Sequence, residues 1–175
     1  MVKQKPHVET SIHAYAAQCE NCWKWRIIPT QEEYEDIRSR VLDEPFVCSM
    51  KTDVSCEDPA DIEYDATRTW ALDKPNIPKT PVGFKRGLIL RKDYSKLDAH
   101  YITPSGTKVR APTHVENYLK AHPELVGISL SDFSFMTPRI AEDTIPEGVE
   151  RKISSSRKKI KFSEKHESKA DSEYQ

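Results

Sequence analysis

The sequence has no long apolar run. No stretch approaches the roughly 18 apolar residues that a membrane-spanning helix needs, and the charged start MVKQKPHVE is unlike a signal peptide. Apolar residues make up 37% of the 175 positions and charged residues 31%, so a large core cannot extend along the whole chain. We therefore expect a soluble intracellular protein with no membrane partner, built from one average domain or two small ones.

Net charge is nearly absent, but the charges are unevenly distributed. The formal net charge is −1. Residues 13–72 contain 13 acidic and 6 basic side chains, a balance of −7, whereas residues 79–120 contain 9 basic and 3 acidic side chains, a balance of +6. This asymmetry predicts two domains, of which the second is suited to a polyanion.

Cysteine is scarce, and its spacing is informative. In a reducing compartment, four cysteines are more often metal ligands, free thiols or catalytic groups than disulfides. A C-x2-C turn aims two sulfurs at one ion, and a second pair, separated by seven residues, completes a tetrahedral set. We therefore expect one structural Zn²⁺ ion, held by Cys19, Cys22, Cys48 and Cys56.

The predicted zinc ion has a structural role. Four thiolates leave no coordination position for water or substrate, so the metal would supply folding energy that a small segment lacks. A zinc hydrolase or deaminase would need an open position, and we expect no enzyme. The alternative is one thiol pair with two unrelated buried cysteines. His13, His114 and His122 have no ligand spacing with one another, so no histidine metal site is expected.

Helical periodicity follows the first cysteine pair. Thr30 and Glu33 form a capping-box pattern, in which the threonine caps the Glu33 amide and the glutamate reaches back. Tyr34, Ile37 and Val41 then recur at spacings of three and four, which is one helical face. The acidic segment therefore contains one short helix.

Strand patterns occupy the basic segment. RGLILRK (86–92), AHYITP (99–104) and TKVR (107–110) are typical of strands. A second capping-box pattern, Thr113 to Glu116, predicts a helix that ends before Pro123. The sequence thus predicts an α+β fold with a small antiparallel sheet and one helix in this segment.

Composition divides the chain into five segments. The first residues have no periodic pattern, three prolines in nine residues mark a linker, and the end of the chain alternates Ser, Lys and Glu with few apolar residues, which predicts disorder. We expect a flexible arm at 1–12, a zinc domain at 13–72, a linker at 73–80, a basic domain at 81–140 and a disordered tail at 141–175.

The tail contains a basic cluster. RKKIK (157–161) follows three serines, and clusters of this length often act as nuclear import signals or as arms that bind DNA. We expect a nuclear protein.

The zinc segment resembles a CW-type zinc finger. YAAQCENCWKWRIIP and FVCSMKTDVSCEDP carry the pattern of that family over about residues 13–72. The matching positions are Gln18-Cys19, Cys22, Lys24-Trp25-Arg26, Cys48, Cys56 and Asp58-Pro59. The resemblance implies a pair of strands with a helix, stapled by zinc.

The same resemblance bears on histone tails. Many members bind methylated lysine of histone H3 between two tryptophans, because an ammonium is attracted to a π face. Trp25 matches the second tryptophan, whereas Ala16 stands at the position of the first and Tyr15 lies beside it. The resemblance thus implies a candidate histone-tail pocket at Tyr15 and Trp25. The alternative is that Trp25 packs beside the zinc site.

The basic segment resembles a methyl-CpG-binding domain. Nearly all of residues 81–119 follows the family pattern, and a CW finger in tandem with this domain is typical of a plant-type subgroup. The matching positions are Pro81-Val-Gly83-Phe84-Lys85-Arg86, Arg91-Lys92, Asp98, Tyr101, Pro104-Ser-Gly106, Lys108-Val-Arg110 and Tyr118-Leu119.

This second resemblance implies a DNA interface. Arg91 and Arg110 would each pair with a guanine of a CpG step, Asp98 would hold the first arginine, and lysines would contact phosphate. His100 and Ala111 depart from the family pattern, so selectivity for methylated CpG does not follow from it. The candidate DNA-binding residues are Arg91, Lys92, Lys96, Asp98, His100, Lys108 and Arg110.

The combined expectation is a nuclear, zinc-containing chromatin protein that binds double-stranded DNA and is not an enzyme. Family resemblance implies transcriptional regulation, with histone tails and deacetylase-type repressor complexes as partners. The alternative is a protein-interaction scaffold of a chromatin complex that recognises neither DNA nor methyl-lysine.

Overall fold

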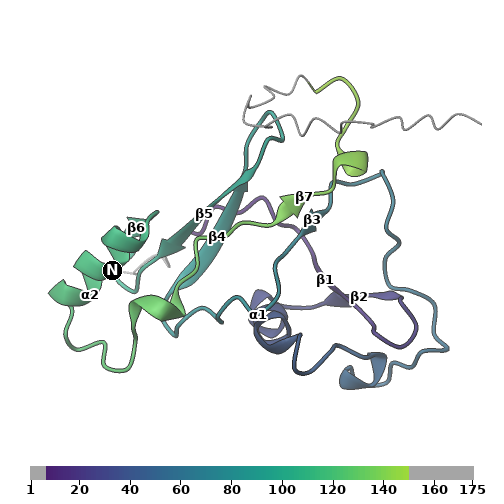
Figure 1. Cartoon of the computed structure of the whole chain (residues 1–175), viewed down its shortest axis with the longest axis horizontal. Coiled ribbons are helices and arrows are strands. Elements are labelled where there is room, and N and C mark those ends of the chain that lie inside the picture. The colour runs from purple at the N-terminus through teal and green to yellow at the C-terminus, as the bar shows by residue number, and fades with distance from the viewer. Residues whose placement is uncertain (1–6, 150–175) are drawn as a thin grey trace, which may run out of the picture.

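The acidic half, residues 13–72, is built on a short hairpin and one helix. Because it contains the four cysteines, it is also called the zinc half below. In the computed structural model, which describes residues 7–149, β1 (Tyr15–Gln18) pairs antiparallel with β2 (Trp25–Ile28), and α1 (Gln31–Arg40) follows (Figure 1). The Thr30 hydroxyl accepts a hydrogen bond from the Glu33 amide at 3.2 Å, which confirms the predicted N-cap.

The apolar core of this half is small. Its buried apolar cluster consists of Ala17, Ile28 and Phe46, with a few half-buried residues of β1 and α1 against it. The cysteine-bearing loop that follows contains little regular structure beyond the short 3-10 helix Cys48–Met50. A segment of this size needs a metal or another staple to supplement its hydrophobic burial.

The basic half contains the predicted antiparallel sheet and helix. β4 (Lys85–Leu90), β5 (Leu97–Ile102) and β6 (Lys108–Val109) pair in that order, and α2 (Pro112–Ala121) lies next to β6 (Figure 1). The helix starts two residues earlier than the capping-box pattern predicts, because Pro112 is favoured in the first helical turn, and its N-cap Ala111 offers no side-chain cap.

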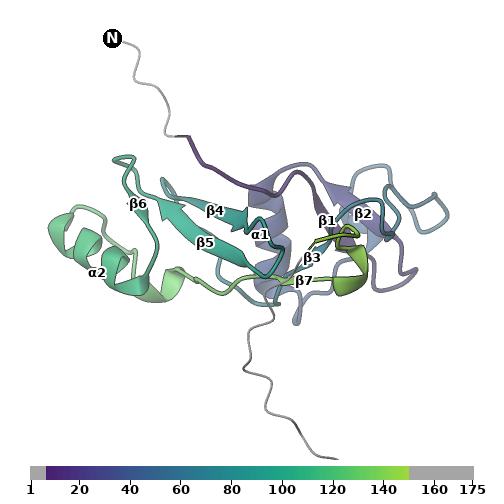
Figure 2. The same cartoon turned by 90° about the horizontal axis from the view of Figure 1, so that it is seen from above.

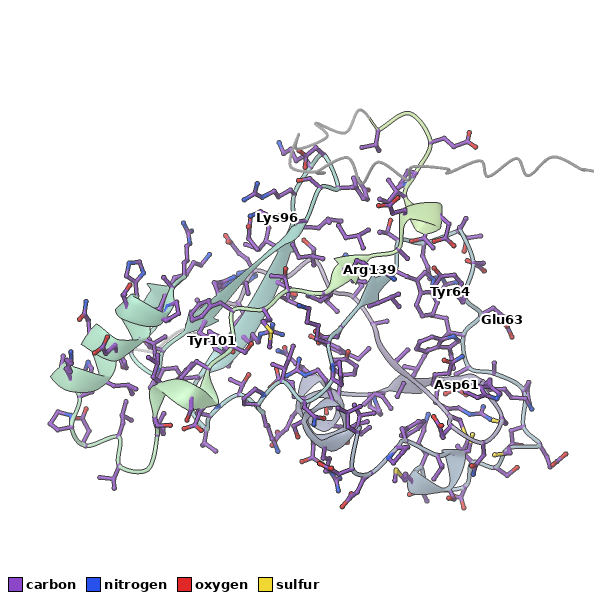
Figure 3. The ribbon with its side chains drawn as sticks, in the orientation of Figure 1. Asp61, Glu63, Tyr64, Lys96, Tyr101 and Arg139 are labelled. Carbon is purple, nitrogen blue, oxygen red and sulfur yellow. The ribbon has the colours of Figure 1, made fainter. Side chains whose placement is uncertain are left out.

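One face of this sheet carries the main core. Phe84, Tyr101, Val109, Val115 and Phe133 form a buried cluster between the sheet, α2 and the short 3-10 helix Leu130–Asp132. Tyr101 is fully buried, and its hydroxyl both donates to the Ser134 carbonyl and accepts from the Ser134 amide at 3.0 Å (Figure 3). The sheet therefore has one face packed against the core and one face turned away from it, as antiparallel sheets commonly do.

A third, two-stranded sheet connects the halves. β3 (Ala71–Leu72) pairs with β7 (Arg139–Ile140), and the short 3-10 helix Glu142–Thr144 follows. Ile140 packs with Leu88 and Leu97 on the same sheet face as the main core. The expectation of disorder is therefore wrong for residues 141–149, whereas residues 150–175, with the RKKIK cluster, lie outside the described residues.

The N-terminal segment is also ordered where it is described. The Ser11 amide donates to the Leu88 carbonyl at 2.7 Å, and the Leu90 amide donates to the Ser11 hydroxyl at 3.0 Å. Ile12 packs against the cluster around Leu88. The expectation of a flexible arm at 1–12 is thus wrong for residues 9–12, because they bind along the free edge of β4.

The predicted linker is packed against the zinc half. Asp73 accepts from Arg38 at 2.9 Å, the Thr80 amide donates to Glu35 at 2.8 Å, and Ile77 is fully buried. Residues 73–80, predicted as a linker, are therefore fixed along α1 by these contacts.

Helix α1 also touches the sheet of the other half. The Gln31 amide group donates to the Arg86 carbonyl of β4 at 2.9 Å and to Glu35 at 2.8 Å. Figure 2 shows α1 against the end of the β4–β5 pair. The two halves form one packed unit, which the sequence alone left open. Neither α-helix of the described region has the length and apolar character of a membrane span.

Candidate zinc centre and nucleic-acid interface

The four cysteine sulfurs converge on one point. Sγ of Cys19 lies 3.9 Å from that of Cys56, Sγ of Cys22 lies 3.6 Å from that of Cys48, and all four atoms lie within 4.8 Å of one another. Tetrahedral zinc with Zn–S bonds of about 2.3 Å requires S···S separations of roughly 3.8 Å. The predicted ligands thus form a site for one structural zinc ion.

Backbone hydrogen bonds favour the thiolate form of one of the four cysteines, Cys19. Burial raises the pKa of the Cys19 thiol, but the surrounding backbone amides, among them those of Cys22 and Cys48, lower it to about 6. The Cys48 amide donates to the Cys19 sulfur at 3.4 Å. Since zinc binds thiolate and not thiol, these hydrogen bonds favour Cys19 as a metal ligand at neutral pH. In the metal-free set, burial raises the pKa of the Cys48 thiol and the hydrogen bond with Cys22 raises that of Cys56, so zinc binding must release protons from these two.

Arg26, in β2 shortly after the first cysteine pair, is buried against the cysteine site. The residue is 1% exposed, and its Nε donates to the Cys48 sulfur at 3.2 Å. The other nitrogens donate to Asp61 at 3.0 Å and to carbonyls of the loop around Cys56 (Figure 3). These carbonyls belong to Ser55, Asp58 and Pro59. Arg26 thus fixes the second cysteine pair against the hairpin that carries the first.

Lys24 supports the same loop from the surface. Its ammonium donates to the Cys56 carbonyl at 2.7 Å and to the Asp58 carbonyl at 2.9 Å. Lys24, the residue before β2, and Arg26 alternate with Trp25, so the two cations face the loop while the tryptophan points to the other side of the hairpin. The two cations of the Lys-Trp-Arg tripeptide therefore hold the loop that carries Cys56.

Tyr15 and Trp25 both line one large groove, but their rings do not face each other as two walls of a cage. In the register of the hairpin, Tyr15 pairs with Ile28 and Trp25 pairs with Gln18, which places the two rings on opposite faces. The Tyr15 ring packs on Tyr34 with centroids 5.0 Å apart, and the Trp25 ring packs on Trp70 at 5.2 Å. The histone-tail pocket at Tyr15 and Trp25 stays a prediction, and the ring contact of Trp25 is with Trp70.

The sheet register brings most of the predicted DNA-binding residues to one face. Asp98 pairs with Ile89, His100 with Gly87, and Ile102 with Lys108. Side chains two apart on a strand share a face, so this set lies opposite the core residues Tyr101 and Val109. Arg91 and Arg110 extend the same alternation just beyond β4 and β6. The residues on this face are Arg91, Asp98, His100, Lys108 and Arg110.

Arg91 and Asp98 form a two-pronged ion pair. Nε of Arg91 donates to one Asp98 oxygen at 2.8 Å, and Nη2 donates to the other at 3.1 Å. The pKa of the Asp98 carboxyl is lowered because Arg91 donates hydrogen bonds to it. Both side chains are about half exposed, so the pair orients the guanidinium while leaving it open to a ligand.

The other cations are distributed around this face. Arg110 is exposed and has no carboxylate partner among residues 7–149. Lys92 and Lys96 lie in the exposed turn between β4 and β5, where Lys96 is 3.7 Å from Asp98 (Figure 3). Lys108 is bound by Glu9, a partner that the sequence did not suggest.

His100 differs from the others in burial. It is 2% exposed, and its Nε2 has no hydrogen-bond partner in the described structure. Burial lowers the pKa of its imidazole, and Lys108 lowers it further. His100 therefore lies on the predicted face as a neutral, covered side chain and not as an open contact residue.

Trp70 is a residue of the site that sequence reasoning missed. It stands near the end of the predicted zinc domain, is buried, and contacts both Trp25 and Tyr64, the latter at 5.0 Å. The Tyr64 hydroxyl in turn donates to Asp143, which links the zinc half to the C-terminal segment (Figure 3). The signal available in the sequence was a tryptophan outside any predicted helix or strand.

Comparison with known proteins agrees with this geometry. The family model for the CW-type zinc finger matches residues 15–62, and that for the methyl-CpG binding domain matches residues 70–143. Methyl-CpG-binding domain-containing protein 4 of Arabidopsis thaliana is 56% identical over 135 residues, which covers 77% of this chain and 73% of the relative. Methyl-CpG-binding domain-containing protein 1 of the same plant is 53% identical over 139 residues, covering 79% and 68%. The chain therefore belongs to the family of methyl-CpG-binding domain-containing proteins, and it carries a CW-type zinc finger in front of that domain.

Proposed function

We propose that this protein is a nuclear, chromatin-associated regulator of transcription that binds double-stranded DNA through the open face of the β4–β5–β6 sheet. The observation that carries the proposal is the common face of Arg91, Asp98, Lys108 and Arg110, with Arg91 already held by a carboxylate. In this proposal the protein acts by binding, and four cysteine ligands leave the zinc no open position for water or substrate.

Each residue type has a defined part in this interface. The forked guanidinium groups of Arg91 and Arg110 match the O6 and N7 acceptors of guanine in the major groove. Asp98 holds Arg91 in one orientation, which reduces the entropy lost on binding. Lys92 and Lys96, exposed in the β4–β5 turn, contribute phosphate contacts that give affinity without sequence information.

Selectivity for methylated CpG is not part of the proposal. His100 stands where the family pattern has a tyrosine that organises water near one methyl group, and here this side chain is 2% exposed. A covered imidazole offers no hydroxyl to such water. We therefore propose that methylated and unmethylated CpG duplexes bind with similar affinity.

The test is a titration of the full chain with matched methylated and unmethylated duplexes, read by fluorescence anisotropy between about 50 and 200 mM salt. Arg91→Ala and Arg110→Ala are each expected to cost roughly 1–3 kcal/mol of binding free energy. Arg40→Ala, which removes the same charge from an exposed position on α1, is the control. Affinity that is absent, or unchanged by the two arginine variants, would instead favour the scaffold alternative.

A second candidate function is histone-tail binding by the zinc half. β1 has a free edge, and a groove of about 880 Å³ runs past it, lined by Ala16, Gln18, Trp25 and Trp70 among others. An extended peptide can add to such an edge by main-chain hydrogen bonds. Since the Trp25 and Trp70 rings are in contact, no methylammonium fits between them, and we propose binding that is insensitive to lysine methylation.

Titration with unmodified and lysine-methylated histone H3 tail peptides checks this second candidate. Equal affinity for both peptides supports it, whereas a clear preference for the methylated form contradicts it. The partnership with deacetylase-type repressor complexes rests on family resemblance, and co-purification of a deacetylase with the tagged full chain from nuclei is its test.

A further inference from the structure

The N-terminal segment wraps around the edge of the sheet that we assign to DNA. Strand β4 is an edge strand, and Ser11 binds along it through Leu88 and Leu90. On one side of this edge, Ile12 packs into the cluster beneath the sheet. On the other side, Glu9 lies over the open face. Figure 2 shows this purple segment passing β4.

Glu9 forms an ion pair with Lys108, a cation to which the proposed function assigns a DNA contact. Its carboxylate accepts from the Lys108 ammonium at 2.6 Å, and Lys108 is 24% exposed although it points to the open face. The pKa of the Glu9 carboxyl is lowered because Lys108 donates this hydrogen bond, so the pair is ionised at neutral pH. A carboxylate thus lies where a phosphate oxygen is expected.

The backbone of the same segment covers the middle of the face. The Glu9 carbonyl oxygen lies 2.7 Å from the point where a Cβ on Gly87 would be, and His100 Cε1 lies 2.4 Å from it. Glu9 and His100 therefore share space that exists only because residue 87 is glycine. This contact explains why His100, on the predicted DNA face, is buried, whereas Arg91 and Asp98 at the far end are half exposed.

We propose that residues 7–10 act as an internal competitor for DNA: Glu9 neutralises Lys108 and the backbone covers the Gly87–His100 strip until a phosphate backbone displaces them. The inference rests on the proposed function. Ser11 and Ile12 anchor the segment, so its displacement requires only the loss of one ion pair and a short stretch of backbone contact. The negative potential of the duplex repels Glu9 as it attracts Lys108.

The test compares duplex affinity of the full chain with that of Glu9→Gln. The matched control is Glu44→Gln, which removes one negative charge from an exposed ion pair at the far end of α1. Glu9→Gln is expected to tighten binding about two- to fivefold relative to Glu44→Gln, which is the range of a partly exposed ion pair. The gain should disappear in the Lys108→Ala background, because the competitor then has no cation to occupy.

The outcomes separate this inference from the proposed function. If Arg91→Ala weakens binding while Glu9→Gln and Glu44→Gln behave alike, the DNA face stands and the competitor is refuted. If no variant changes affinity, the DNA face itself is refuted. Hydrogen exchange gives a second readout: saturating duplex should speed exchange of the amides of residues 8–10, and slower exchange would show that the segment binds DNA and overturn the proposal.

Discussion

The Arg38 guanidinium lies 2.9 Å from the Asp73 carboxylate, and the two side chains are only 5% and 6% exposed. Arg38 belongs to α1 of the zinc half, and Asp73 belongs to the segment that leads to the basic half. Arg38 also donates to the Pro78 carbonyl at 3.2 Å. A buried charge pair joins the two halves, so the zinc finger and the sheet are held in a fixed relation.

This ion pair predicts a large loss of stability on truncation. Arg38→Ala leaves Asp73 buried without its partner, which costs about 3–5 kcal/mol of unfolding free energy. Urea unfolding of the full chain measures it. Arg40→Ala, two residues away in an exposed pair with Asp36, should change the same free energy by less than about 1 kcal/mol. Equal effects of the two variants would show that the interface carries little energy.

Zinc removal is predicted to unfold the acidic half. Its apolar cluster is small, and the sulfur geometry is the main staple, so Cys48→Ser or chelation should abolish the bound ion and the structure of the hairpin. Metal analysis and circular dichroism provide the measurements, with zinc re-addition as the control. Chelated protein that keeps its full signal would contradict the structural role of the metal.

Arg26 is predicted to resist conservative replacement. Arg26→Lys keeps the charge but cannot donate from one planar group to the Cys48 sulfur, Asp61 and the loop carbonyls together. We expect a loss of about 2–4 kcal/mol in unfolding free energy, because buried acceptors lose their donors. Thermal unfolding in excess zinc checks it. Lys51→Arg, at a more exposed partner of Asp61, should be nearly silent.

His100 predicts a pH dependence of stability. Burial lowers its folded-state pKa below the ordinary value of 6.5, so the unfolded chain binds the proton more readily. The contribution of the neutral His100 side chain to the unfolding free energy is fully present above pH 6.5. It is lost as the pH falls through the folded-state pKa. Urea unfolding at stepped pH should show this slope in the native chain and a smaller slope in His100→Asn. An identical slope in both would assign the effect to other groups.

The sequence predicted what depends on local chemistry. The cysteine cluster follows from a short spacing pattern whose geometry is nearly self-contained. The Arg91–Asp98 pair was implied by the resemblance to the methyl-CpG-binding domain, and the structure contains it. By contrast, Tyr15 lies on the other face of its strand from Trp25, which only the pairing register decides. A one-residue difference in a strand reverses the face of a side chain, and residue types alone do not report it.

Long-range contacts could not be predicted from the sequence, for a different reason. Arg38, Asp73 and Glu9 look like ordinary surface charges, and only the tertiary fold brings each of them to a partner. The pairing of Ala71 with Ile140 spans most of the basic half and involves very short strands, which carry no detectable periodicity. The ordered ends at residues 9–12 and 141–149 follow from such contacts.

The most direct test of the account is amide chemical-shift mapping of the full, zinc-loaded chain on addition of a CpG duplex. The largest changes should fall on the open sheet face and its flanking turn, at Arg91, Lys96, Asp98, Lys108 and Arg110. Small changes are expected at Val115 in the core beneath α2 and at Cys48 in the zinc site. Changes concentrated on the zinc hairpin, with the open face silent, would contradict the central claim that this sheet face binds DNA.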